Sequence, residues 1–353
     1  MKAVVIKGAF KVEVEQQPVP TIQKPTDVII KTHYSGLCGS DLHNYRQTEP
    51  GTGFILGHEV VGEIVEIGAA VQKFKVGDVV ASPFSLSCGN CWYCNKGYPA
   101  RCHQATFYGC PQLPGCQAEF VRTPLADASL FLIPQDVKPE TMLLMGDILP
   151  TGYSCAYNAR RLLDEDDERV DLTVKDGVAV VIGCGPVGLC AITSAKSMFS
   201  HVFATDPTPE RRQLAKHHGA IALPLDELEG AVLAATEGRG ADAALELVGN
   251  EGAVNTALDL VRPFGVVSSI GIHIKPLTIS GDTLYSKNVR MQFGRCSVRK
   301  YFPGALKVLQ QNKDLFSRFI EHKVRFDQAE EYYDLFNRGK IAKTVFVADD
   351  IPL

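Results

Sequence analysis

The sequence lacks both a large excess of one charge and a long uninterrupted hydrophobic run. The 36 Lys and Arg and 40 Asp and Glu give a formal net charge of −4, which argues against nucleic-acid or anionic-membrane partners. The most apolar stretch, residues 178–192, is broken by glycines and a proline and is shorter than the roughly 20 residues of a membrane span. The N-terminus has no long apolar segment after its lysine, so we expect no secretory signal. These absences predict a cytoplasmic protein.

Evidence for an oxidising compartment is also missing, although the chain has 11 cysteines. Four of them lie close together with the spacing Cys-x2-Cys-x2-Cys-x7-Cys: Cys88, Cys91, Cys94 and Cys102. Loop-forming residues such as Gly89 and Gly97 separate them, so incidental core cysteines are a poor explanation. Four thiolates on one short loop match the closed tetrahedral site of structural zinc.

Two patterns of secondary structure divide the chain of 353 residues. Residues 1–150 contain short β-branched segments bounded by Gly, Pro or Asp, which favour a mostly β unit with long loops. After about residue 152, apolar runs such as 178–182 alternate with helical stretches. That alternation predicts an α/β fold with a parallel sheet covered by helices.

A glycine-rich turn follows the apolar run at 178–182 and precedes a helical stretch. Its sequence is Gly183-Cys184-Gly185-Pro186-Val187-Gly188. In this context the first glycine permits the tight turn, the second admits a pyrophosphate, and the third allows close helix packing. The turn therefore predicts binding of a dinucleotide at a helix N-terminus.

Asp206 ends the next predicted strand and suits a ribose-binding role. A carboxylate there accepts hydrogen bonds from the adenosine ribose and repels a 2′-phosphate, which favours NAD(H) over NADP(H). Alternatively, Asp206 caps the following helix, because Pro207 and Thr208 come directly after it. Arg211 and Arg212 keep a phosphate-binding alternative open.

A second group of metal-binding residue types is dispersed. Cys38 lies in the run Ser-Gly-Leu-Cys-Gly-Ser-Asp-Leu-His, and the Gly-His-Glu that contains His58 follows twenty residues later. Catalytic zinc takes about three protein ligands and keeps one open position. Cys38 and His58 would supply two of them, although each alone has a structural explanation as a buried thiol or a core histidine.

Taken together, the Cys38-to-His43 run, the Gly-His-Glu, the four-cysteine loop and the glycine turn resemble the zinc-containing medium-chain dehydrogenase/reductase family. The motifs stand in the family's order over nearly the whole chain. The resemblance implies a GroES-like β-barrel catalytic domain, residues 1–151 and 298–353, and a Rossmann NAD-binding domain, residues 152–297. It also implies that the cofactor and the catalytic zinc lie in a cleft between them.

The resemblance supplies a third ligand for the catalytic zinc, Asp147, where many members of the family carry cysteine. This aspartate, the run Pro-Thr-Gly-Tyr at 150–153 and the segment Phe-Gly-Arg-Cys at 293–296 are similar to the formaldehyde-dehydrogenase-like branch. Glu59 is expected to approach the metal or to support its ligands, and Asp41 to orient His58 or a nearby cation. Two zinc ions per chain follow, one catalytic and one structural.

The resemblance also implies a mechanism. Zinc lowers the pKa of the substrate alcohol, and Ser40 passes the proton through the nicotinamide ribose to His43 while hydride moves to NAD. Thr151 is expected to contact the nicotinamide, Lys343 the pyrophosphate and Arg211 the adenosine ribose. Further NAD contacts are expected at Val248, Gly271 and Ile272.

The predicted function is therefore a zinc-dependent oxidoreductase that transfers a hydride between an alcohol, or its aldehyde or ketone, and NAD(H). Relatives that reduce C=C or C=N bonds provide one alternative, and non-enzymatic members such as lens crystallins another. The resemblance further implies a homodimer or homotetramer. Residues Phe84 and Phe107 suggest a moderately apolar substrate pocket, and a partner-binding role for the acidic segment 164–171 stays open.

Overall fold

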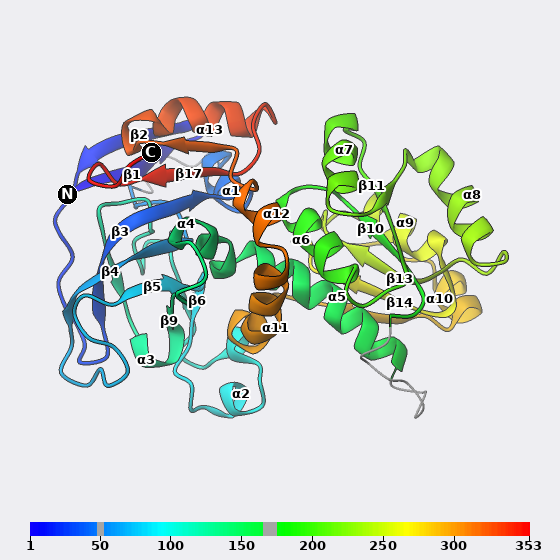
Figure 1. Ribbon diagram of the computed structural model, residues 1–353, viewed down its shortest axis with the longest axis horizontal. Helices are drawn as coiled ribbons and strands as arrows, with labels where there is room; N and C mark the ends of the chain where they lie inside the picture. Colours follow the sequence, from blue (N-terminus) through cyan, green and yellow to red (C-terminus); the bar gives the residue numbers. More distant parts are fainter. Residues whose placement is uncertain (48–52, 165–174) are drawn as a thin grey trace. The chain divides into compact units, whose positions relative to one another are not determined.

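The computed structural model describes residues 1–47, 53–164 and 175–353, and these residues form two compact units (Figure 1). The first unit comprises Met1–Asp147 and Ser297–Leu353, and the second comprises Ile148–Cys296. The boundaries predicted from the sequence fall a few residues later along the chain. Residues 165–171 of the acidic segment lie outside the described residues.

A mixed β-sheet dominates the first unit. Its strand order is β16-β17-β3-β4-β5-β9, with β8 paired to β3, and the pairs are antiparallel except for β16 with β17. Two short hairpins, β1-β2 and β6-β7, accompany it. The strands are β1 Lys2–Gly8, β2 Lys11–Gln16, β3 Val28–Leu37, β4 Val60–Ile67, β5 Val79–Ser82, β6 Ser85–Leu86, β7 Thr106–Phe107, β8 Phe120–Thr123, β9 Phe131–Leu132, β16 His322–Val324 and β17 Thr344–Val347.

Short helices connect these strands, and the two longest helices of the unit, α11 and α13, follow the return of the chain at Ser297. The α-helices of this unit are α1 Asp41–Tyr45, α2 Trp92–Asn95, α3 Ala126–Ser129, α4 Pro139–Met142, α11 Val298–Gln311, α12 Lys313–Ser317 and α13 Ala329–Asn337. The 3-10 helices are Pro99–Arg101, Leu143–Gly146 and Phe326–Gln328. Helix α13 packs its buried Ala329 and Tyr333 into a core cluster with Val4, Leu37 and Leu56. The C-terminal segment therefore completes the core of the first unit.

The second unit contains a six-stranded parallel sheet with the order β12-β11-β10-β13-β14-β15. The order reverses direction between β10 and β13, which is the arrangement of a dinucleotide-binding Rossmann sheet. Its strands are β10 Val178–Ile182, β11 His201–Thr205, β12 Ile221–Ala222, β13 Ala241–Glu246, β14 Val261–Ser269 and β15 Arg290–Phe293. Its helices are α5 Ile148–Asp164, α6 Pro186–Ala195, α7 Pro209–His217, α8 Leu225–Ala235, α9 Glu251–Leu260 and α10 Gly281–Lys287.

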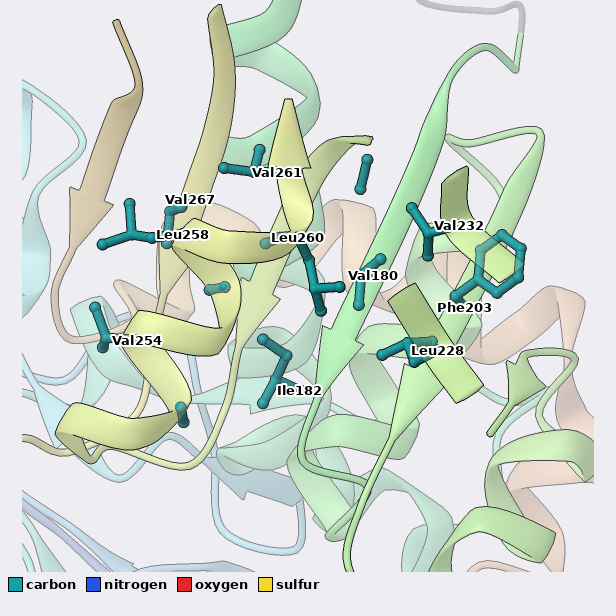
Figure 2. Close-up of a cluster of buried hydrophobic side chains, with 14 of the residues drawn as sticks. Val180, Ile182, Phe203, Leu228, Val232, Val254, Leu258, Leu260, Val261 and Val267 are labelled. Carbon is teal, nitrogen blue, oxygen red and sulfur yellow. The ribbon is translucent and has the colours of Figure 1, made fainter. Parts of the chain in front are cut away.

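Strand β10 is buried along its whole length, as expected for a central strand covered on both faces. Figure 2 shows Val180 and Ile182 of this strand among side chains from β11, α8, α9 and β14. Burying a side chain such as Ile182 contributes roughly 1.5–3 kcal/mol relative to leaving it in water. This core holds the strand ends in register, and the structure confirms the predicted parallel α/β sheet.

Candidate functional site

The predicted structural zinc ligands converge on one loop of the first unit. Cys88, Cys91, Cys94 and Cys102 place their sulfur atoms within 4.8 Å of one another. The Sγ atoms of Cys91 and Cys94 are 3.6 Å apart, and those of Cys88 and Cys102 are 3.4 Å apart. These distances exceed a disulfide bond of about 2.0 Å and approach the roughly 3.8 Å between sulfurs around tetrahedral zinc. The four thiols therefore fit a closed metal site.

The dispersed residues Cys38, His58, Glu59 and Asp147 form a second, more buried cluster. Cys38 follows β3, His58 and Glu59 precede β4, and Asp147 follows the 3-10 helix Leu143–Gly146. Oδ2 of Asp147 lies 3.6 Å from Sγ of Cys38 and 3.3 Å from Nε2 of His58. Zinc bonds of about 2.0–2.3 Å in tetrahedral geometry hold donor atoms roughly 3.3–3.8 Å apart. Asp147 therefore stands at a zinc-like separation from both Cys38 and His58, and all three donors lie within 4.8 Å of one another.

Glu59 lies behind these donors in a buried ion pair. Its Oε2 accepts a hydrogen bond from Nζ of Lys343, which also donates to the carbonyl of Leu37 over 3.3 Å. A Cβ at Gly36 would fall 1.7 Å from Glu59 Oε2, so only glycine leaves room for the carboxylate. Burial opposes the charge on Lys343, but Glu59 raises the pKa of the ammonium above its usual range. In this structure the ammonium of Lys343 is therefore paired with Glu59. The contact between Lys343 and the pyrophosphate stays a prediction.

One oxygen of Glu59 has no hydrogen-bond partner in the described part of the chain. Oε1 is buried and, among the described residues, accepts no hydrogen bond. An orphaned carboxylate oxygen in a buried site is costly unless a cation or water compensates it. Its position in the same cluster as Cys38, His58 and Asp147 fits a resident metal ion.

Asp41 orients the imidazole of His58. Oδ1 of Asp41 lies 3.1 Å from Nδ1 of His58, and Oδ2 accepts the backbone N–H of Cys38 over 3.0 Å. Burial alone would lower the pKa of His58, but Asp41 and the other anionic neighbours raise it well above its usual range. With Nδ1 facing Asp41, the other ring nitrogen, Nε2, faces Asp147. This is the usual support for a metal-bound histidine.

Of the two predicted proton-transfer residues, Ser40 contacts this cluster. Oγ of Ser40 is 3.9 Å from Sγ of Cys38, and Ser40 is half-buried. His43 lies on α1 and is exposed to solvent. Ser40 is therefore within reach of a group bound next to Cys38, while His43 can exchange protons with water.

In the second unit, the glycine turn has the predicted geometry. Gly183 has φ of +94°, which favours glycine, and a Cβ at Gly188 would fall 1.9 Å from the carbonyl oxygen of Gly183. A Cβ at Gly185 would meet no atom within 4 Å, so the turn is open at its second glycine. Pro186 and Val187 begin α6 there. The open space above a helix N-terminus suits a pyrophosphate.

Thr151 lies on α5, where that helix touches α6. A Cβ at the adjacent Gly152 would fall 2.5 Å from the amide nitrogen of Ala191 and 2.7 Å from the carbonyl oxygen of Val187. The missing side chain therefore lets the two helices meet closely. This contact places Thr151 next to the glycine turn along α5.

Asp206 is buried at the end of β11. Its Oδ1 accepts the N–H of Thr208 over 2.9 Å, as in the capping alternative, and its Oδ2 accepts the N–H of Cys184 over 3.0 Å. Nη1 of Arg211 lies 3.7 Å from Oδ2, and Arg212 donates to the carbonyl of Asp206. Asp206 thus stabilises both the glycine turn, through Cys184, and the turn that leads into α7, through Thr208.

The remaining predicted cofactor residues follow β13 and β14. Val248 and Ile272 expose their apolar side chains, and a Cβ at Gly271 would fall 2.2 Å from the amide nitrogen of Gly249. The two loops therefore touch. Together with the glycine turn and Asp206, they lie at the carboxyl ends of neighbouring parallel strands, where Rossmann sheets bind their ligands.

A buried carboxylate that the sequence analysis missed anchors these loops. Oε1 of Glu246 accepts the N–H groups of Val248 and Gly249 over 2.8 and 2.7 Å. Its Oε2 accepts the hydroxyl of Ser269 over 2.6 Å and lies 3.3 Å from Nε2 of His273. The one available signal was an acidic residue at the end of an otherwise apolar strand, ADAALE.

Comparison with known proteins supports both units. Residues 24–135 match the alcohol dehydrogenase GroES-like domain, and residues 186–311 match the zinc-binding dehydrogenase family. The chain is 42% identical to zinc-type alcohol dehydrogenase B of Aspergillus flavus, over 99% of this chain and 82% of that protein. The chain belongs to the zinc-containing medium-chain dehydrogenase/reductase family. The resemblance predicted from the sequence is therefore confirmed at the level of this family.

Two further relatives of this medium-chain dehydrogenase/reductase are informative. It is 45% identical to the medium chain reductase/dehydrogenase ucsI of Acremonium sp, over 81% of this chain and 98% of that protein. It superposes on alcohol dehydrogenase TADH from Thermus sp. ATN1 with a TM-score of 0.89 and 32% identity, covering 98% of this chain and 99% of that one. The predicted Rossmann and GroES-like architecture is confirmed, whereas the formaldehyde-dehydrogenase-like branch stays a prediction.

These findings make the protein an oxidoreductase of the zinc-dependent, NAD-binding type. Two donor clusters that could hold two zinc ions accompany an NAD-binding fold. None of the helices in the described part of the chain is long and apolar enough to cross a bilayer.

Proposed function

We propose that this medium-chain dehydrogenase/reductase is an NAD-linked alcohol dehydrogenase that interconverts a small alcohol and its aldehyde or ketone. The observation that carries the proposal is the convergence of Cys38, His58 and Asp147 with Ser40 beside them. Three donors of sulfur, nitrogen and oxygen type are typical of catalytic zinc, which keeps a fourth position open. Names of relatives such as zinc-type alcohol dehydrogenase B point the same way.

Zinc held by Cys38, His58 and Asp147 would act as a Lewis acid that lowers the pKa of the alcohol and polarises the carbonyl. The protein's own groups do the rest. Asp41 holds the ring of His58. Ser40 accepts the hydroxyl proton at Oγ while it releases its own hydroxyl proton towards His43 and solvent, so the serine stays neutral. His43, exposed on α1, exchanges that proton with solvent. A positioned acid–base group of this kind contributes about 10²–10⁴ in rate.

Glu59 places a buried carboxylate beside the metal-binding residues. Its Oε2 is held by Lys343 while its Oε1 has no partner among the described residues, so the carboxylate is anchored on one side only. We propose that Lys343 keeps Glu59 ionised and fixed beside the metal ligands. NAD(H) would be held in the second unit by the glycine turn, Thr151, Asp206 and Arg211, and when bound it would supply the hydride chemistry.

Reduction of a C=C or C=N bond is the second candidate, favoured by the reductase/dehydrogenase name of the Acremonium relative. The two chemistries differ in their need for Ser40. Alcohol oxidation loses a hydroxyl proton to Ser40, whereas reduction of an activated alkene has no hydroxyl proton to remove.

The test is a steady-state assay of purified, metal-analysed protein with NAD(H), using primary, secondary, aromatic and polyol alcohols, carbonyls and activated alkenes. Wild type should oxidise at least one alcohol, and Ser40→Ala should lower that kcat by about 10²–10⁴ with unchanged zinc content. Ser87→Ala, a buried serine on the structural-cysteine loop, is the matched control. Turnover of alkenes alone, unaffected by Ser40→Ala, would replace the proposal with the reductase function.

We further propose that the chain assembles as a homodimer or homotetramer and acts on small molecules only. Light scattering of the purified protein reports the assembly directly, and a monomer at assay concentration would refute it.

A further inference from the structure

A chain of buried hydrogen bonds extends from His58 through Asp41 to the C-terminal helix α13. Asp41 lies between His58 and the side chain of Gln117, whose Nε2 donates to Asp41 Oδ2 over 3.4 Å and to the carbonyl of Gly36 over 3.1 Å. The hydroxyl of Tyr333 donates to Oε1 of Gln117 over 2.7 Å. Gln117 and Tyr333 are separated by 216 residues and have no solvent exposure.

The hydrogen-bonding partners fix the orientation of the Gln117 amide. The carbonyl of Gly36 can only accept, so the amide nitrogen must face it and Asp41. The amide oxygen then faces Tyr333, whose hydroxyl is its donor. If that hydroxyl were removed, the buried oxygen would lose its partner, and a rotated amide would present its oxygen to the carboxylate of Asp41.

Packing links Gln117 to His58 by a second route. Gly57, directly before His58, has φ of +91°, and a Cβ there would fall 2.6 Å from Cγ of Gln117. Asp41 itself has, in the described part of the chain, Gln117 as its one side-chain partner besides His58. The position of the Gln117 amide therefore constrains both the Asp41 carboxylate and the backbone that carries His58.

We infer that Gln117 and Tyr333 are positioning residues that set the orientation of His58 through Asp41, and so tune the metal site from the C-terminal helix. The inference rests on the metal site of the proposed function. Neither side chain is placed against substrate or cofactor; both act through Asp41. Mutation of a residue that hydrogen-bonds directly to a metal ligand typically lowers metal affinity or activity by about 10–100-fold.

Tyr45 provides the matched control. It is buried in the same core cluster, and its ring centroid lies 5.2 Å from that of Tyr333. Its hydroxyl makes none of the contacts of the Gln117 network. Tyr333→Phe and Tyr45→Phe therefore remove the same atom from neighbouring rings, but only the first should disturb the amide of Gln117.

The experiment is 113Cd NMR of the full-length, cadmium-substituted protein, together with zinc release from the native protein to a chromogenic chelator. Four thiolates deshield cadmium far more than one thiolate with nitrogen and oxygen donors, so the two sites give separate resonances. Tyr333→Phe should shift the single-thiolate resonance and leave the four-thiolate resonance in place. It should also release the corresponding zinc roughly threefold to tenfold faster, since its effect passes through two intervening residues.

Gln117→Met keeps a side chain of similar length but removes the amide, and it should change the resonance and the release rate in the same direction. The inference is therefore tested even if one of the two variants folds poorly. Tyr45→Phe should match wild type in both measurements. Wild-type resonance and release rate in Tyr333→Phe and Gln117→Met would overturn the inference while leaving the metal site intact. A wild-type protein with a four-thiolate resonance alone would overturn the metal site of the proposed function itself.

Discussion

The backbone N–H of Cys184 donates to Oδ2 of Asp206 over 3.0 Å, joining the glycine turn to the end of the neighbouring strand. The same carboxylate accepts the N–H of Thr208 through its other oxygen. Asp206 therefore fixes the turn that would hold the pyrophosphate, and a carboxylate retains further lone pairs for the adenosine ribose. The capping and cofactor-binding explanations of Asp206 are compatible.

Asp206→Asn should weaken NAD more than NADP. The amide removes the charge that attracts the ribose hydroxyls and repels a 2′-phosphate, and hydrogen bonds to charged groups are worth about 1.5–3 kcal/mol. We expect NAD affinity to fall about tenfold or more and the ratio of NAD to NADP affinity to fall with it. Titration of both cofactors checks this, with exposed Asp226→Asn as the control. An unchanged ratio would leave Asp206 with the capping role alone.

Glu246→Ala should loosen the loops that carry Val248 and Gly271. Removing the carboxylate leaves the N–H groups of Val248 and Gly249 without their acceptor. We expect NADH affinity to fall about tenfold, measured by the fluorescence of bound NADH, because hydrogen bonds to a charged group are worth about 1.5–3 kcal/mol. Glu246→Gln should be intermediate, and exposed Glu251→Ala should bind like wild type. Tight NADH binding by both Glu246 variants would show that the loops do not need this anchor.

The fold and part of the site were predictable because their signals are local. The four cysteines occupy one short loop, and the glycine turn stands between a buried strand and a helix, so spacing alone places them. Asp147 was different. Its separation from Cys38 along the sequence is 109 residues, and only the resemblance to a known family identified it as a ligand.

Polar pairs between residues far apart in the chain could not be predicted from the sequence. Lys343 meets Glu59 across 284 residues, and Tyr333 meets Gln117 across 216. No periodicity or spacing encodes such pairs, because tertiary packing alone brings the two side chains together. Glu246 was overlooked for a related reason: its partners are mainly backbone groups of loops whose path the sequence does not reveal.

Cys94→Ser should destabilise the first unit through loss of its structural metal. Losing a ligand from a closed zinc site lowers both metal affinity and folding free energy. A loss of about 3 kcal/mol would lower Tm by roughly 6–12 °C in a unit of this size. Calorimetry with zinc analysis measures both effects. Cys110→Ser, a free cysteine outside either cluster, is the control, and equal Tm values for the two variants would argue against a structural metal.

His218 should make stability fall on acidification. Burial lowers its pKa from 6.5 to about 4, and Nδ1 lies 2.7 Å from the hydroxyl of Thr193. Between pH 4 and 6.5 this histidine binds more protons in the unfolded chain than in the folded protein. The stability that neutral His218 contributes is therefore complete above pH 6.5 and is lost as the pH falls towards 4. The loss amounts to about 3 kcal/mol.

His218→Gln should therefore flatten the dependence of unfolding free energy on pH between about 4 and 6.5. Denaturant unfolding across this interval measures the slope. His201→Gln, at an exposed position that does not contribute to the pKa of His218, should keep the wild-type slope. A wild-type slope in His218→Gln would mean that other groups cause the acid sensitivity.

The most direct test of the alcohol dehydrogenase proposal is steady-state turnover of alcohols with NAD, measured on metal-analysed wild type, Cys38→Ala and Asp147→Ala. Wild type should contain about two zinc ions per chain and oxidise an alcohol. Each variant should keep about one zinc, held by the four-cysteine loop, and lose turnover by at least about 100-fold. Two zinc ions and wild-type turnover in either variant would contradict the account.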